Sequence, residues 1–352
     1  MGEEHDRYSV EIFLLVQGIG VVCESSLRAR RNPRNDGILV FATRGESITE
    51  AGQGTERRFI LSMIKCIQLE HSDVIQQLRD DYLRTLVAPM DGMWESAVIA
   101  HATFWEIQDR EQHAGYFCLG SNHDLLRFHL WENYQDQAQE IFRWMISTYG
   151  IQHAIASTIE PLYFSLCLDF QRSIALHSYL FRDNQRRELS SGLSKSIFRK
   201  AEEREVDDMV RFYQANTEGS GEWIEAFLNA RLNREELLVL YDQQTLVAAG
   251  ECIPSQKQPP YADLGMVVAR SYRGRGLGSF LLTQLKKHCY EAGWKPICSC
   301  EASNRASKKA IEKAGFISEQ RMVKITFSGD EHLHLSKIGR TRLSSASSVS
   351  SM

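Results

Sequence analysis

The chain has 352 residues, of which 43% are apolar and 24% are charged. This length is enough for about two domains of ordinary size, each with a buried core. With 41 basic and 45 acidic residues the formal net charge is −4. No large positive excess favours nucleic acid as a partner, and no acidic excess indicates a solvating, disordered chain.

The eight cysteines lie mostly inside apolar runs, where a free cysteine packs as a small hydrophobic residue. They are too few for the disulfide scaffold of a small secreted protein, and no Cys-x-x-Cys pair or His/Cys cluster has the spacing of a zinc site. We therefore expect a protein of the reducing cytoplasm that holds no metal.

The chain begins with a segment that lacks clear periodicity. Its apolar stretch, residues 10–23, is too short for a bilayer span of about 20 residues, and it follows acidic residues where a signal peptide needs positive charge. We expect neither a signal nor a membrane partner. Residues 1–57 are expected to lie outside the fold, and Met63 is a candidate natural start.

Patterned sequence then alternates strand and helix through the first half of the chain. The expected strands are 63–69, 101–108, 113–119, 125–130, 152–157 and 173–181, and the expected helices are 72–87, 134–149 and 160–170. A polar stretch around residues 182–192 interrupts the pattern and is typical of a linker between domains.

The second half continues in the same manner. The expected strands are 196–201, 236–241, 245–253, 261–269, 296–300, 316–319 and 321–327, and the expected helices are 203–215, 222–230, 276–292 and 304–314. A Ser-rich tail, residues 339–352, has almost nothing to bury and is expected to be disordered.

The two halves repeat one order of elements, which predicts a duplicated fold of the α/β (α+β) class. The offset between Thr158 and Asn304 equals that between Phe170 and Phe316. The expected boundaries are 58–183 for the amino-terminal lobe, 184–195 for the linker and 196–338 for the carboxy-terminal lobe.

The segment that carries chemistry is a glycine- and arginine-rich turn between an apolar strand and an amphipathic helix. It reads Arg273-Gly274-Arg275-Gly276-Leu277-Gly278. Glycines allow the backbone to approach an anion, and the start of a helix presents unpaired N–H groups and partial positive charge. Two arginines add mobile charge for a phosphate. The spacing fits neither the Rossmann fingerprint nor the P-loop, so the residues indicate a phosphate-bearing ligand of another kind.

Two blocks of this sequence resemble the GCN5-related N-acetyltransferase (GNAT) superfamily. Arg273, Gly276 and Gly278 match its acyl-coenzyme A motif, Gln/Arg-x-x-Gly-x-Gly/Ala. About thirty residues later, Asn304 and Ser307 precede a helix that ends in Gly-Phe, as in the second family block. The resemblance covers residues 196–336 well and reaches 63–181 only through the order of elements.

The resemblance implies a GNAT-type mixed, mostly antiparallel sheet flanked by helices, and acetyl-coenzyme A as co-substrate without a metal. It implies that the backbone of the preceding strand binds the pantetheine arm and polarises the thioester, and that the Gly-rich turn binds the pyrophosphate. The residues assigned to the coenzyme are Met266, Val267, Val268, Arg273, Gly274, Arg275, Gly276, Leu277, Gly278, Asn304 and Ser307.

An amine nucleophile must lose a proton, which a carboxylate can take directly or through water. The candidates for this base are Glu251, Asp263 and Glu301, and Glu251 is the first choice because its strand neighbours the motif strand. An alternative for each is a solvated acid at a strand end.

One position departs from the family pattern. Many members carry a Tyr seven residues after the Asn, and it protonates the leaving thiolate, whereas this chain has Ile311. Either the thiolate leaves unassisted or another group donates. The possible donors are Ser307, Cys300 and Tyr290. For Cys298 and Cys300, packing in the core is the alternative role.

The amino-terminal lobe lacks a phosphate site at the matching place. The helix at that place begins near Glu132 and Asp136, and no glycine occurs there. Both the bulk of the side chains and their negative charge therefore oppose an anion. We expect this lobe to form a wall of the substrate cleft or to support the other lobe. Residues 91–95 are either a loop that presents Trp94 to that cleft or the cap of a helix with a packed Trp.

Three functions remain open at this point. The first is an enzyme that moves acetyl from acetyl-coenzyme A to a primary amine of a small molecule or peptide, by direct attack in a ternary complex. The second is a coenzyme A-binding sensor or scaffold without turnover. The third is an acetyltransferase that modifies proteins recruited through the amino-terminal lobe.

Overall fold

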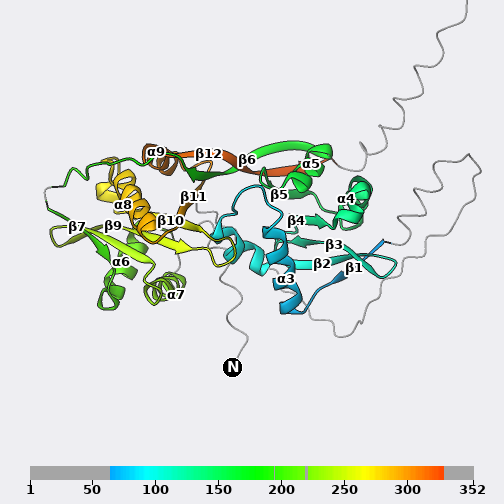
Figure 1. Ribbon diagram of the computed structural model, residues 1–352, viewed down its shortest axis with the longest axis horizontal. Coiled ribbons are helices and arrows are strands. Elements are labelled where there is room, and N and C mark those ends of the chain that lie inside the picture. Colours follow the sequence, from blue (N-terminus) through cyan, green and yellow to red (C-terminus); the bar gives the residue numbers. More distant parts are fainter. Residues whose placement is uncertain (1–63, 194, 219–220, 329–352) are drawn as a thin grey trace, which may run out of the picture.

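A computed structural model describes residues 64–193, 195–218 and 221–328 (Figure 1). The predictions for residues 1–57 and 339–352 lie outside these residues. Within them, the strands join into a single sheet in the order β1-β2-β3-β4-β5-β12-β6-β11-β10-β9-β8-β7. The sheet therefore runs through both lobes without a break.

The strands agree closely with those expected. They are β1 (Ile64–Gln68), β2 (Thr103–Asp109), β3 (Gln112–Leu119), β4 (Leu125–Leu130), β5 (His153–Ser157), β6 (Gln171–Asp183), β7 (Ser196–Lys200), β8 (Leu237–Asp242), β9 (Thr245–Pro254), β10 (Tyr261–Val268), β11 (Lys295–Glu301) and β12 (Phe316–Phe327). Most neighbours are antiparallel, and the parallel pairs are β4–β5 and β10–β11.

The helices flank this sheet. They are α3 (Ser72–Leu83), α4 (Ala138–Thr148), α5 (Pro161–Asp169), α6 (Val206–Asn216), α7 (Gly221–Leu232), α8 (Leu277–Glu291) and α9 (Arg305–Lys313). Several bury an apolar stripe, as with Ile141, Phe142 and Met145 of α4. The expected helix 134–149 is shorter as an α-helix because a 3₁₀ segment, Glu132–Gln137, precedes it.

The lobes exchange their last long strands. In the amino-terminal lobe, β12 lies between β5 and β6, and in the carboxy-terminal lobe, β6 lies between β11 and β12. Each lobe thus has the same seven-strand order and uses one strand of the other (Figure 1). Because of this reciprocal exchange, the repeated order of elements in the sequence becomes the same strand order in both lobes.

The expected break between residues 316–319 and 321–327 was wrong. Both segments belong to β12, which pairs with β6 along its length and changes register between Ile317 and Gln320. The polar run Ser318, Glu319 and Gln320 has the composition of a turn, but here it forms a bulge that keeps the strand continuous.

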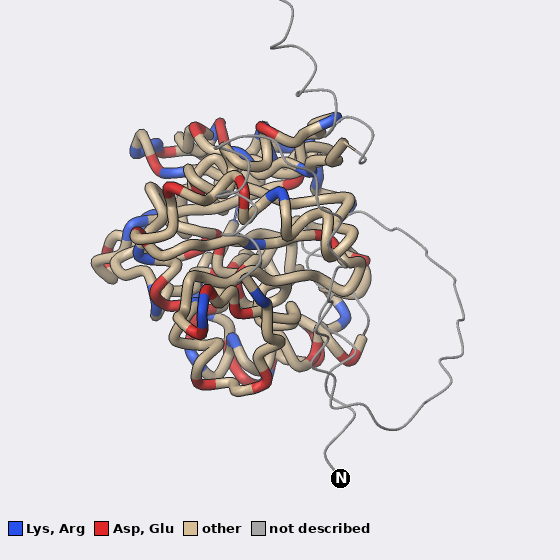
Figure 2. The backbone as a smooth tube through the Cα atoms, turned by 90° about the vertical axis from the view of Figure 1, so that its right-hand side faces the viewer, with Lys and Arg blue, Asp and Glu red and all other residues tan. Residues whose placement is uncertain are grey.

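Acidic and basic residues are interspersed along the described backbone, as the colours of Figure 2 show from one side. This distribution fits the small net charge of −4. Within the described residues, no helix is both long and apolar enough to cross a membrane.

Strands β10 and β11 pair only at one end. Their parallel register joins Tyr261 to Lys295, Ala262 to Pro296 and Asp263 to Ile297, and it stops there. Beyond Asp263 the two strands separate, while β10 continues to pair with β9 as far as Val268. The separation leaves a wedge in the middle of the sheet.

Candidate functional site

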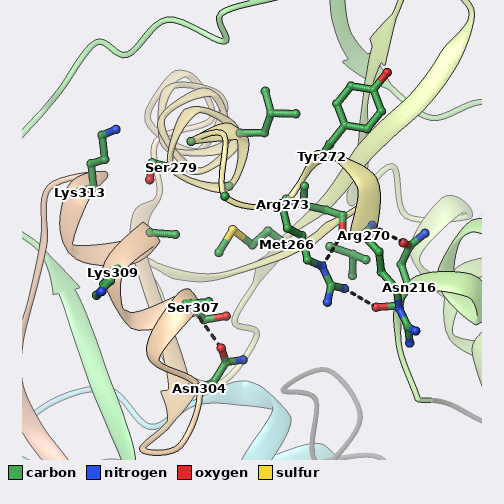
Figure 3. A pocket seen from close by; sticks show the side chains of 18 of the residues that line it. Asn216, Met266, Arg270, Tyr272, Arg273, Ser279, Asn304, Ser307, Lys309 and Lys313 are labelled. Atoms are coloured by element: carbon green, nitrogen blue, oxygen red, sulfur yellow. Dashed lines mark hydrogen bonds between the residues drawn. The ribbon is translucent and has the colours of Figure 1, made fainter.

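A cavity of about 500 Å³ opens beside the end of β10, between α8 and α9 (Figure 3). Its lining comes from the end of β10, the turn 270–278, the first turn of α8, one face of α9 and the end of α6. Of the residues predicted to bind the coenzyme, it includes Met266, Val267, Val268, Arg273, Gly274, Gly276, Leu277, Gly278, Asn304 and Ser307. The fold thus brings together two sequence blocks that lie thirty residues apart.

The glycines of the turn are required by its backbone. Gly274 and Gly276 have φ angles of 77° and 86°, in the left-handed region that favours glycine. Gly276 directly precedes α8, so the unpaired N–H groups of that helix begin at the cavity wall. At Gly278 a Cβ would lie 3.1 Å from Sδ of Met266, so the absence of a side chain lets α8 pack closely on β10.

The two arginines of the turn contact neighbouring groups of the protein. The Arg273 guanidinium donates to the backbone carbonyls of Val268, at 3.1 Å, and of Asn216, at 2.6 Å (Figure 3). It therefore ties the end of α6 to the end of β10. The Arg275 guanidinium lies over the Tyr272 ring, 5.1 Å from its centroid, and is not part of the described cavity lining. Its contact with the coenzyme stays a prediction.

Basic side chains that the sequence reasoning missed line the cavity. Arg270 lies on one side of it, and Lys309 and Lys313 lie on the other, on α9 (Figure 3). Lys309 and Lys313 are four residues apart and share one helix face with Ala306 and Ala310. The helical spacing of the second family block would have found them. Together with Arg273 they outweigh the single acid of the described lining, Glu218.

The backbone of β10 turns free N–H groups toward the wedge. The N–H of Ala269 donates to Val247 on β9, and Val267 pairs with Ala249 on the same strand. Because backbone groups alternate sides along a strand, those of Met266 and Val268 face away from β9. Between the two residues expected to polarise the thioester, the register thus favours Val268 over Val267.

Asn304 and Ser307 meet at the start of α9. The backbone N–H of Ser307 donates to Oδ1 of Asn304 at 3.0 Å, which caps the helix. Ser307 also lines a second, smaller cavity of about 80 Å³, and so does Met266. The two cavities therefore adjoin at these residues.

The smaller cavity contains the predicted base, Glu251. Its side chain is 3% exposed, and its Oε1 accepts a hydrogen bond from the Tyr213 hydroxyl at 2.5 Å. Burial raises the pKa of the Glu251 carboxyl, and the Tyr213 hydrogen bond partly offsets this. Tyr213 was missed because α6 shows an ordinary amphipathic pattern with no sign of a polar partner.

The other two candidate acids are placed differently. Asp263 lines the smaller cavity, and burial together with the nearby Asp91 carboxylate raises the pKa of its carboxyl well above the usual value. Glu301 lines neither of the two described cavities. Its carboxylate accepts a hydrogen bond from the Ser303 hydroxyl at 3.3 Å, and burial raises its pKa. Its role in proton transfer stays a prediction.

The possible proton donors lie in different parts of the structure. Ile311 lines the smaller cavity, and so do Ser307 and Cys300. Burial raises the pKa of the Cys300 thiol to about 12, so this side chain is a thiol at neutral pH. The Tyr290 hydroxyl instead donates to Asp183 and lies outside both described cavities.

The amino-terminal lobe has a matching wedge that is filled by protein. There β4 and β5 pair only at Leu125 and Ala154. The fully buried Arg127 donates to Glu95 and lies over the Tyr82 ring, 4.1 Å from its centroid. Tyr82 in turn donates to Glu160 at 2.5 Å. A charged network of side chains thus occupies this lobe where the other lobe has its cavity.

Residues 91–95 form the cap of a helical segment with a packed Trp, as one of the two alternatives predicted. Trp94 is 2% exposed, and Asp91 accepts hydrogen bonds from the backbone of Met93 and Trp94. The segment also reaches the other lobe, since Asp91 and Met93 line the smaller cavity. No group of three or more His, Cys, Asp or Glu side chains in the described part of the chain is placed to hold a metal.

Comparison with known proteins adds a family to this geometry. Residues 71–184 match the family described as "Acetyltransferase (GNAT) domain", and residues 198–316 match "Acetyltransferase (GNAT) family". The expected duplication is therefore confirmed, since each half matches a GNAT description. Comparison with curated protein sequences gave no significant match.

The solved structures that are similar over three quarters of the chain include two GNAT proteins. An acetyltransferase of the GNAT family from Colwellia psychrerythraea has 31% identity and a TM-score of 0.70, with 75% of this chain and 100% of that chain covered. A GCN5-related N-acetyltransferase from Sphaerobacter thermophilus has 11% identity and a TM-score of 0.54, with 75% and 95% covered. The second likeness concerns the fold alone.

Proposed function

Because the chain belongs to the GNAT acetyltransferase family, we propose that it is an N-acetyltransferase that uses acetyl-coenzyme A. The acetyl group passes directly to a primary amine of a small molecule or peptide in a ternary complex. The reaction takes place in the carboxy-terminal lobe, and the amino-terminal lobe binds no coenzyme of its own.

The observation that carries this proposal is the junction of the two cavities at the wedge. The larger cavity has the features that a coenzyme A molecule needs: a left-handed glycine turn at a helix start, and basic side chains on two sides. Residues 274–278 would hold the pyrophosphate, with Lys309 and Lys313 near the phosphates. The pantetheine arm would follow β10, whose Met266 and Val268 offer free backbone groups.

The chemistry follows from the residues where the cavities meet. Glu251 takes the proton of the amine, and its raised pKa suits this role. The amine nitrogen then forms a bond to the acetyl carbon, and the bond from that carbon to sulfur breaks. The N–H of Val268 stabilises the negative charge that develops on the carbonyl oxygen.

The leaving sulfur departs as a thiolate in this proposal. Ile311 lines the smaller cavity with hydrocarbon and has no proton to donate. A coenzyme A thiol is acidic enough to leave in the charged form, and Ser307, which borders both cavities, is a candidate hydroxyl donor. The absence of a Tyr here is also the observation that favours the second candidate function, coenzyme A binding without turnover.

One experiment separates the two functions. Acetyl-coenzyme A at about 100 Kd should stabilise the full chain by about 2.7 kcal/mol in thermal unfolding. Consumption of acetyl-coenzyme A is then followed with polyamines, amino acids, aminoglycosides and peptides. Stabilisation with turnover supports the enzyme, stabilisation without turnover of any acceptor supports the binding module, and no stabilisation contradicts both.

A matched pair of variants assigns the binding to the proposed site. Gly276→Trp fills the glycine turn and should abolish the stabilisation. Gly293→Trp places the same side chain at another left-handed glycine, where a Cβ meets nothing within 4 Å. It should leave the stabilisation by acetyl-coenzyme A intact.

A further inference from the structure

The smaller cavity is built by both lobes, although the coenzyme cavity belongs to one. From the carboxy-terminal lobe it takes Glu251, Asp263 and Ser299, and from the amino-terminal lobe it takes Asp91 and Met93. It adjoins the larger cavity at Met266 and Ser307. An acceptor that reacts with a thioester at the wedge would occupy this space.

The ionisable groups of the cavity are all acidic. Its described lining contains three carboxyl groups, those of Asp91, Glu251 and Asp263, and no Lys, Arg or His. Burial raises the pKa of Glu251 and of Asp263, and a cation bound beside them would oppose that rise by favouring their charged forms. A further carboxylate in the cavity would be repelled.

Two carboxyl groups of this cavity each use one oxygen for a hydrogen bond to a neighbouring element. Oε1 of Glu251 accepts from the Tyr213 hydroxyl, and Oδ1 of Asp263 accepts from the N–H of Gly92 at 3.2 Å. Both side chains are more than nine-tenths buried and line the cavity. A ligand in the cavity would therefore lie within reach of their second oxygens.

The amino-terminal segment is held firmly against this site. Besides the Gly92 bond to Asp263, the N–H of Met90 donates to Oε1 of Gln258 at 3.1 Å. The Ser299 hydroxyl on β11 donates to Asp91. At Gly92 a Cβ would lie 2.7 Å from Oδ2 of Asp263, so the two lobes touch here without room for another atom. The charge of Asp91 is thus a fixed part of the cavity.

We propose that the acceptor is a primary amine bound in its cationic form, without a carboxylate beside the amine, and that Asp91 and Asp263 select it. This inference rests on the function proposed above and assigns the amino-terminal lobe a share in acceptor choice. The ammonium binds between the two aspartates and stabilises their charged forms. Glu251 takes one of its protons before the nitrogen attacks the thioester. The nitrogen loses its second proton as the carbon–sulfur bond breaks, and the departing coenzyme A thiolate takes up that proton. The first proton stays on Glu251 until solvent removes it.

Two acceptors of the same size test the charge rule. Alaninamide and alanine differ in that an amide replaces the carboxylate. We expect kcat/KM for alaninamide to exceed that for alanine by at least about tenfold, since like charges repel in a buried site. Nα-acetyl-lysinamide carries the ammonium on a longer stem. It tests whether a lysine side chain can also be the acceptor.

Charge-neutral substitution tests the role of the amino-terminal lobe. Asp91→Asn retains an oxygen for the backbone bonds of Met93 and Trp94 but removes the charge. We expect the KM for alaninamide to rise about tenfold, as for loss of a charge-assisted contact, with the KM for acetyl-coenzyme A unchanged. Asp80→Asn is the matched control, because Asp80 pairs with Lys257 across the same junction at 2.5 Å but does not line the cavity.

The outcomes distinguish this inference from the function on which it depends. If acetyl-coenzyme A neither binds nor reacts, the proposed function fails. If it binds and alanine reacts as well as alaninamide, or Asp91→Asn leaves the alaninamide KM unchanged, this inference is overturned alone. If neither acceptor reacts, their binding to the coenzyme A-saturated chain is measured by calorimetry, and failure of alaninamide to bind more tightly than alanine overturns it as well.

Discussion

Oε2 of Glu251 lies directly over Gly265, so closely that a Cβ on that residue would come within 2.1 Å of it. The two residues pair across β9 and β10, and no Cβ tolerates such a contact. The glycine therefore makes room for the carboxylate to lie over the strand that lines the wedge. Its role is a spatial one, since no unusual φ is required there.

Gly265→Ala should displace the Glu251 carboxylate and reduce kcat by at least about tenfold, because a misplaced base loses much of its effect. Acetyl-coenzyme A binding should persist, since Gly265 does not line the larger cavity. The measurement is steady-state turnover together with coenzyme-induced thermal stabilisation.

The control for this variant is Gly221→Ala in the same lobe. There a Cβ would meet only the side-chain amide of Gln214, at 2.7 Å, and a flexible side chain can move away. Full activity of Gly265→Ala, or an equal loss in Gly221→Ala, would show that the Glu251 position does not limit the rate.

The Tyr213 hydroxyl should set the pH at which activity begins. Burial raises the pKa of Glu251, and the hydrogen bond from Tyr213 opposes that rise by stabilising the charged form. In Tyr213→Phe the pKa should rise further. The acid limb of the kcat/KM profile should then move to higher pH by about one unit, the size expected for a hydrogen bond to a charged group.

A second Tyr–Glu pair in the same lobe provides the comparison. Tyr241 donates to Oε1 of Glu205 at 2.7 Å, and neither residue lines the smaller cavity. Tyr241→Phe should leave the pH profile where it is. An unmoved acid limb in Tyr213→Phe would remove Glu251 as the base, and a shift to lower pH would contradict the assigned effect of the hydroxyl.

The basic face of α9 should contribute to coenzyme affinity. Replacing both Lys309 and Lys313 by Gln should weaken acetyl-coenzyme A binding by about tenfold or more, because each loses a charge available to phosphate. The loss should shrink at high salt, which screens exposed charges. Lys308→Gln is the control on the same helix, since Lys308 pairs with Glu312 at 2.5 Å and does not line the cavity. Equal affinities in titration calorimetry for all three proteins would rule out a role for this face.

The sequence predicted most elements because the pattern of apolar residues is strong in each of them. The glycine turn at 274–278 could be predicted because few residues other than glycine adopt its backbone conformation. Contacts between residues far apart in the sequence could not be predicted in this way. Arg273 contacts Asn216, and Asp91 contacts Ser299, and no local pattern marks either partner. The strand exchange could not be predicted for the same reason, since the sequences of β6 and β12 have the pattern of ordinary last strands of their lobes.

The buried network of the amino-terminal lobe should be important for stability. Arg127 is fully buried and pairs with Glu95, which lies one helical turn after Asp91. Arg127→Met removes the hydrogen-bonded partner of the Glu95 carboxylate and leaves it only the longer pair with Arg79, at 3.7 Å. Breaking a buried pair in this way costs about 3–5 kcal/mol in unfolding free energy. The double variant Arg127→Met, Glu95→Gln should regain part of this loss, because the poorly paired buried charge is gone. Denaturant unfolding measures both.

The exposed Arg182–Glu319 pair is the control, and Arg182→Met should change stability far less. A double variant no more stable than Arg127→Met would mean that packing, rather than charge pairing, is what Arg127 supplies.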